Sequence, residues 1–151
     1  DATFEVFAGG PCYAGQTVAE GCVDGVQDLS GARLNNAPEW FLATAAQYRK
    51  TLGSSGLEGF LRGDVSYRTE VFTDVNQDPA SIQDAYTLVN ASVGVATEDG
   101  RYRVAVFGKN ITDVDYAFRR SQFGNTVGIP NGSSAFLAIP AMYGVSVSGR
   151  F

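Results

Sequence analysis

The chain closes with Tyr143-Gly144-Val145-Ser146-Val147-Ser148-Gly149-Arg150-Phe151, in which apolar residues alternate with small or polar ones. Tyr143, Val145, Val147 and Phe151 fall on one side of this alternation. Successive side chains of a β-strand point to opposite faces, so the pattern predicts an extended segment with one apolar face and one polar face. We therefore expect a strand here and not a helix.

The same alternation recurs upstream, and it is clearest over 57–72. There Leu61 and Val65 alternate with Arg62 and Asp64. An ordinary globular strand has about five or six residues, so a segment as long as this one is typical of a barrel. We expect strands at 39–52, 57–72, 86–97, 101–109 and 143–151, preceded by a truncated first strand at 2–7.

The connections between these strands alternate in length. Residues 53–56 (Gly-Ser-Ser-Gly) and 98–100 (Glu-Asp-Gly) are short turns, whereas 8–37, 73–85 and 111–140 are long loops. A compact soluble domain rarely carries structureless loops longer than about 15 residues. Short turns on one rim and long loops on the other are typical of outer-membrane barrels. The predicted fold is therefore all-β, an antiparallel transmembrane β-barrel meander.

Composition excludes several classes of protein. The 151 residues carry a net charge of -5, which argues against nucleic acid as a partner because phosphate contacts need a concentrated basic surface. No apolar run approaches the roughly 18 residues of a membrane helix. Alternating barrel strands of about ten residues remain possible, because they are never apolar on average.

Nothing in the sequence indicates catalysis. There is no histidine, which removes the usual Ser-His-Asp triad, HExxH zinc sites and imidazole acid-base chemistry. Asp74, Asn76 and Asp78 begin like a calcium loop, but Pro79 stands where glycine is required and Ala85 where the bidentate glutamate belongs. We expect no enzyme, no catalytic residue, no metal and no cofactor.

The two cysteines, Cys12 and Cys22, lie in a loop-like stretch. They lack the second pair or the histidines that a zinc site requires. A disulfide is the favoured interpretation, with two reduced buried thiols as the alternative. The disulfide requires Cα atoms within about 7 Å and implies an oxidising compartment.

Several motifs, in this order, resemble the carboxyl-terminal end of TonB-dependent outer-membrane receptors. They are Cys12 to Thr17 with Cys22, Gln27 to Gly31, Asn36 to Trp40, Asp84 to Asn90, Phe107 to Asp113 with Tyr116, and Tyr143 to Phe151. Each motif alone is common, but their order covers nearly the whole chain. The resemblance implies that residues 1–151 form about the last six strands of a 22-stranded barrel, with short periplasmic turns and long extracellular loops.

The resemblance also implies the location and the partners. The chain is expected in the bacterial outer membrane as a fragment or processed piece, with the plug domain and the earlier strands upstream of it. Its expected partners are outer-membrane lipid, the plug domain, the TonB complex, the barrel-assembly machinery and a small-molecule ligand. Tyr143, Val145, Val147 and Phe151 match the carboxyl-terminal barrel-assembly signal of such proteins.

Within that framework, individual side chains receive expected roles. Glu58, Arg62, Asp64 and Arg68 are expected to face the lumen, where charges stay solvated or pair with the plug, since charges on the lipid side are costly. A second group is expected in the aromatic girdles at the membrane interface, with ordinary sheet packing as the alternative: Trp40, Tyr48, Tyr67, Tyr86 and Tyr143. Ligand recognition in an extracellular loop is assigned to Phe118, Arg119, Arg120, Gln122 and Phe123, with Phe136 as further stacking surface and unremarkable loop residues as the alternative.

The predicted function is active transport of a scarce bulky nutrient, such as a ferric siderophore, across the outer membrane with energy delivered through TonB. A passive outer-membrane porin would share the alternating strands. A soluble all-β extracellular carbohydrate-binding module is the alternative from another class. The upstream sequence and the behaviour of the protein on extraction distinguish these possibilities.

Overall fold

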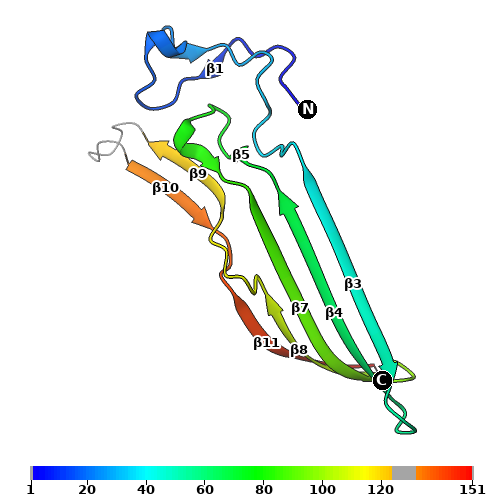
Figure 1. The fold of residues 1–151 in the computed structure, drawn as a ribbon. Helices are drawn as coiled ribbons and strands as arrows, with labels where there is room; N and C mark the ends of the chain where they lie inside the picture. Colours follow the sequence, from blue (N-terminus) through cyan, green and yellow to red (C-terminus); the bar gives the residue numbers. More distant parts are fainter. Residues whose placement is uncertain (1, 124–131, 151) are drawn as a thin grey trace. The chain divides into compact units, whose positions relative to one another are not determined.

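The computed structural model describes residues 2–123 and 132–150, and it is all-β with antiparallel pairing (Figure 1). Two compact units share the chain. Unit 1 comprises Asp1–Trp40, Arg68–Tyr86 and Asp115–Ala138, and unit 2 comprises Phe41–Tyr67, Thr87–Val114 and Ile139–Phe151. Among the described residues, no helix has the length and apolar character needed to cross a membrane.

Unit 2 is built on a five-stranded sheet in the order β11-β8-β7-β4-β3. The strands are β3 (Phe41–Thr51), β4 (Leu57–Arg68), β7 (Tyr86–Thr97), β8 (Tyr102–Lys109) and β11 (Met142–Gly149). The predictions of strands at 39–52, 86–97, 101–109 and 143–151 are confirmed, although Phe151 lies outside the described residues. The two short turns lie at one end of the sheet, and the long connections leave from the other end (Figure 1).

One face of this sheet, the aliphatic face, is made by valines that lie opposite one another. Val106 of β8 pairs with Val93 of β7 and Val145 of β11, and Val104 pairs likewise with Val95 and Val147. Residues that face each other across a ladder share a side of the sheet, so these rows are continuous. Val106 is 55% exposed and Val145 67% exposed, so the apolar face is open.

The opposite face, the polar face, is closely packed where Phe60 crosses β7 and β8. The ring of Phe60 is 5% exposed and lies against Gly94, where a Cβ atom would approach the Phe60 Cζ atom to 2.8 Å. Gly144 has the same relation to the ring of Phe107, at 2.8 Å. A side chain at 94 would collide with the Val104 carbonyl oxygen as well as the Phe60 ring, and one at 144 would force the Phe107 ring to move.

The turn after β8 anchors the start of β11 through Asn110, which has a φ of 47° and is 5% exposed. Its side-chain Nδ2 donates to the carbonyl oxygens of Val114 and Ile139 at 3.0 and 3.4 Å, and its Oδ1 accepts from the Val114 N–H at 3.0 Å. Asp113 Oδ1 accepts from the Ala141 N–H at 2.8 Å. This turn therefore fixes where β11 begins.

Unit 1 contains short elements and a hairpin. Its elements are β1 (Gly10–Pro11), η1 (Val18–Glu20), β2 (Val26–Gln27), β5 (Val71–Phe72), η2 (Pro79–Ser81), β6 (Ile82–Gln83), β9 (Ala117–Phe123) and β10 (Gly132–Leu137). The disulfide prediction is confirmed, because Cys12 and Cys22 are bonded with their Cα atoms 5.8 Å apart. The buried Gln27 amide donates to the carbonyl oxygens of Pro11 and Asn76 at 2.7 and 2.8 Å and so joins two loops.

Three sequence-based expectations are wrong in detail. Residues 2–7 form no strand but an irregular segment with one isolated bridge, Thr3 to Arg33, because single hydrogen bonds tie them to residues 29–34. The strand expected over 57–72 ends at Arg68 and resumes only as β5. The loop expected over 111–140 contains the β9–β10 hairpin.

The expected closed barrel is not found in the described residues. Their main sheet is open, with β3 and β11 at its edges. Closure requires further strands to hydrogen-bond with both of these edges.

Replacing Asn110 by alanine is expected to lower the free energy of unfolding by about 2–4 kcal/mol, because three hydrogen bonds are lost and alanine disfavours a positive φ. The measurement is denaturant unfolding of the protein, with Thr112→Ala as the matched control in the same turn. Thr112 is exposed, so its replacement should leave stability nearly unchanged. Equal effects of the two substitutions would contradict the anchoring role of Asn110.

Gly94→Ala is expected to destabilise the protein by about 1–3 kcal/mol through overpacking. The new methyl group would collide with the Val104 carbonyl oxygen and would meet the Phe60 ring at 2.8 Å. Gly63→Ala is the matched control in β4, because the nearest atom to its Cβ is the Asn90 carbonyl oxygen at 3.9 Å. Denaturant unfolding compares the two variants, and a Gly94 variant as stable as the Gly63 variant would show that the close contact is absent.

Candidate functional site

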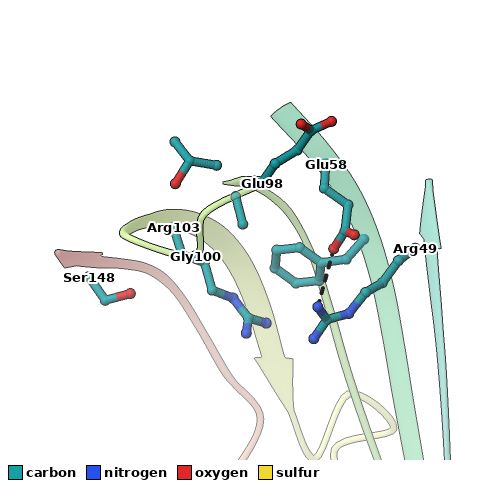
Figure 2. A pocket seen from close by; sticks show the side chains of 9 residues that line it. Arg49, Glu58, Glu98, Gly100, Arg103 and Ser148 are labelled. Atoms are coloured by element: carbon teal, nitrogen blue, oxygen red, sulfur yellow. Dashed lines mark hydrogen bonds and ion pairs between the residues drawn. The ribbon is translucent and has the colours of Figure 1, made fainter. Parts of the chain in front are cut away.

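A pocket of about 270 Å³ lies on the polar face of the unit 2 sheet, near the end that carries the short turns (Figure 2). Strands β3, β4, β7, β8 and β11 all contribute to it, together with the turn after β7. Its lining residues are Arg49, Glu58, Phe60, Ala96, Thr97, Glu98, Gly100, Arg103 and Ser148. Two guanidinium groups and two carboxylates therefore meet in one recess.

Two contacts organise these charges. Arg49 Nη1 lies 3.2 Å from Glu58 Oε1, the ion pair drawn in Figure 2. The Arg103 guanidinium carbon lies 3.9 Å above the centre of the Phe60 ring, a cation–π arrangement. The Arg49 side chain is 58% exposed, and exposed ion pairs contribute only about 0–1 kcal/mol to stability. These charges are therefore accessible to a polar partner and stabilise the fold only weakly.

The four residues expected to face the lumen have separate environments. Glu58 lines the pocket. Asp64 lies on the same face but further along β4 from the short turns, and its Oδ2 accepts from Asn90 Nδ2 at 2.6 Å. Arg62 is exposed. In unit 1, Arg68 Nη1 lies 3.5 Å from the Tyr86 hydroxyl oxygen and its guanidinium carbon 5.5 Å from the Tyr86 ring centre. The structure thus gives these charges different partners.

Asn90 is a residue that sequence reasoning missed. Its Oδ1 accepts from the Asn110 N–H at 2.9 Å while its Nδ2 donates to Asp64, so it links β4, β7 and the turn after β8. The signal available in the sequence was a single amide inside the apolar strand 86–97. Such a residue must satisfy several hydrogen-bonding groups when it is partly buried.

The predicted ligand-binding residues all belong to β9, within the β9–β10 hairpin of unit 1. Arg119 lies opposite Phe136, whereas Arg120 lies opposite Ala135 and Gln122 opposite Ser133. Arg119 and Arg120 therefore point to different faces of the hairpin. The strand register shifts beside Phe118, and the side chain of Phe123 lies outside the described part of the structure. Arg120 and Gln122 share one face of the hairpin and line one cavity, whereas Arg119 lies on the other face.

An aromatic stack runs through unit 1 from Tyr86 to Phe118. The rings of Tyr86 and Tyr116 are stacked with centres 4.4 Å apart, and Tyr116 meets the Phe118 ring edge-on at 5.8 Å. Burial raises the pKa of the Tyr116 hydroxyl, and the neighbouring Tyr86 adds to this shift. Phe118 is 63% exposed, so the stack ends at a free aromatic surface.

The remaining aromatic and terminal residues are mostly exposed. Trp40, Tyr48 and Tyr143 are each more than half exposed, whereas Tyr67 and Tyr86 are half-buried. The Tyr143 ring covers Gly108 of β8, where a Cβ atom would meet the ring at 3.0 Å. Val145 and Val147 project from β11 on the aliphatic face, and the expectation for Phe151 falls outside the described residues.

The calcium-like segment forms a polar loop of unit 1. Asp74 Oδ2 lies 3.6 Å from Arg119 Nη2, Asn76 Oδ1 accepts from the Asp78 N–H, and Asp78 Oδ1 accepts from the Ala80 N–H. These carboxylate and amide oxygens shape the loop and begin η2. Within the described ranges, no three His, Cys, Asp or Glu residues gather in a way that could hold a metal ion.

No protein-family model, curated protein or solved structure matches the chain. Functional inference therefore depends on the residues themselves and on the geometry in which they lie.

Proposed function

We propose that this chain is a carboxyl-terminal part of the transmembrane β-barrel of an outer-membrane active-transport receptor of the TonB-dependent kind. In this proposal it imports a scarce bulky nutrient, such as a ferric siderophore, and the bacterial outer membrane is its location. The observation that carries the proposal is the two-faced sheet of unit 2, with valine rows exposed on one side and charges on the other.

Lipid is the solvent that suits the aliphatic face. Contact with water would cost about 25 cal/mol for each Å² of apolar surface that Val93, Val106 and Val145 expose. Arg49 and Arg103 lie on the opposite face, where a barrel has its water-filled interior. Arginine at the lipid midplane would cost roughly 2–4 kcal/mol. The distribution of side chains therefore favours a membrane over a soluble carbohydrate-binding module.

The connections support the same proposal. Both short turns lie at one end of the sheet, and the long connections leave from the other end (Figure 1). In a barrel the short turns belong to the periplasmic rim and the long connections to the outside. The polar pocket with Arg49, Glu58 and Arg103 then lies in the lumen near the periplasmic rim, where a plug domain offers polar partners.

The importer is preferred to a passive porin because of the motif order given above, from Cys12 to the final strand. Its proposed partners are the plug domain, the TonB complex, the surrounding lipid and the barrel-assembly machinery. Energy coupling separates the two functions. Uptake of radioactive iron from a panel of ferric siderophores should stop when a protonophore removes the proton-motive force, whereas uptake through a porin should continue.

The membrane location has a direct test in β11. Spin labels at Val145→Cys and Ser146→Cys, in protein kept in its native envelope, are expected to differ in collision partner. The label at 145 should collide preferentially with oxygen, which concentrates in lipid, and the label at 146 with a water-soluble nickel complex. The neighbouring position is the matched control, because adjacent strand residues face opposite sides.

Two outcomes would overturn the membrane proposal. One is equal access of the nickel complex to both labels. The other is release of the protein from washed envelopes by salt alone, without detergent, which an integral barrel does not allow.

A further inference from the structure

A cavity of about 140 Å³ lies in unit 1 between β9, β10 and Ala80. Its polar lining is contributed by Arg120, Ser121, Gln122, Ser133 and Ser134. We propose that this cavity binds an oxyanion group, a carboxylate, phosphate or sulfate, through the guanidinium of Arg120 and the neighbouring neutral donors. The proposal concerns unit 1 alone and does not depend on the membrane location of the sheet.

The charge of Arg120 has no counterpart in the described residues. Its Nε atom is buried without a hydrogen-bond partner, and no ion pair to its guanidinium occurs in the described part of the chain. None of the described residues that line the cavity is acidic. A buried donor atom without a partner is costly, and the partly buried Arg120 side chain carries a positive charge, so the cavity is electrostatically suited to a negative group.

Arg119 shows the contrast within the same strand. Its Nη2 atom lies 3.6 Å from Asp74 Oδ2, a carboxylate that is 16% exposed. The register places Arg119 on the other face of the hairpin, opposite Phe136. Of two consecutive arginines, therefore, one is neutralised by the protein and one is left for a ligand.

The residues around Arg120 leave room and supply donors. Ala135, a small residue, lies directly opposite Arg120, and Ser133 lies opposite Gln122 on the same face. The Gln122 amide and the Ser133 hydroxyl are neutral hydrogen-bond donors. Arginine binds carboxylate and phosphate oxygens through two parallel N–H···O hydrogen bonds. The small side chain of Ala135 leaves space beside Arg120 for such a group.

The backbone at Arg120 is held in place by a buried hydroxyl. Thr73 Oγ1 accepts from the Arg120 N–H at 2.8 Å and lies 2.7 Å from the Ser81 carbonyl oxygen, to which it donates. At the start of β9, Gln83 Oε1 accepts from the Ala117 N–H at 2.8 Å. Because the strand is fixed at two points to the segment 73–83, the site is largely formed before any ligand arrives, which lowers the cost of binding.

The volume of about 140 Å³ gives the cavity room for an oxyanion group. The ligand is therefore a small free oxyanion or the anionic end of a larger molecule. Both kinds of ligand present the same oxyanion group, and the experiment below tests which oxyanion is preferred.

The experiment is isothermal titration of the purified full-length protein with sodium phosphate, sodium sulfate and sodium acetate, at constant ionic strength set by chloride. Arg120→Gln removes the charge, Arg120→Lys keeps the charge but loses the planar fork, and Arg119→Gln is the matched control. We expect saturable binding of at least one anion by the unmodified protein. Binding should weaken at least about tenfold in Arg120→Gln and should change less than about twofold in Arg119→Gln.

The variants distinguish a ligand site from a structural role. Arg120→Lys should retain weaker binding than the unmodified protein and should unfold at a similar denaturant concentration, which shows that any loss is not a loss of fold. Preference for acetate would identify a carboxylate ligand, and preference for phosphate or sulfate a tetrahedral one.

Three results would overturn the proposal. They are no binding of any of the three anions, binding by Arg120→Gln that equals that of the unmodified protein, and equal losses in Arg119→Gln and Arg120→Gln. Failure here leaves the membrane proposal intact, because the spin labels report on β11 of unit 2.

Discussion

The register of β8 against its two neighbours is the constraint on which the sheet depends. A slip of one residue would move every valine of β8 to the polar face and bring Arg103 to the aliphatic face. Close packing opposes such a slip, because the Phe60 ring lies against Gly94 and the Phe107 ring against Gly144, where little room is left for a larger residue. Packing on the polar face thus determines what the aliphatic face presents.

The two units are stabilised by different interactions. In unit 2 the strands are joined by backbone ladders and by the packing of a few rings, whereas the interior of unit 1 is rich in polar groups. Ser81 is fully buried, and Thr73, Asp78 and Gln83 are almost so, each hydrogen-bonded to backbone groups. Directional bonds of this kind specify one loop conformation where apolar surface is scarce. The disulfide of Cys12 and Cys22 adds a covalent constraint to the same unit.

Strict alternation explains how far sequence reasoning could succeed. Residues 86–97 and 101–109 were predicted as strands because their valines recur with period two, and the sheet confirms both. The β9–β10 hairpin could not be found in this way, since Arg119, Arg120 and Ser121 place polar side chains on both of its faces. Its position depends on Thr73 and Gln83, which are remote in sequence. The sequence also does not tell which of the two arginines has an acidic partner. The structure shows that Asp74 pairs with Arg119 and not with Arg120.

The placement of Arg120 shows how a rigid support and a variable surface can be combined. Thr73 hydrogen-bonds with the backbone N–H and carbonyl oxygen of Arg120, so these bonds do not depend on the side chain at that position. The side chains at 120, 122, 133 and 135 can then differ without loss of the hydrogen bonds between Thr73 and the backbone of β9. A hairpin supported through its main chain therefore allows ligand preference to change while the fold is retained, which is the property that a recognition loop on a fixed scaffold requires.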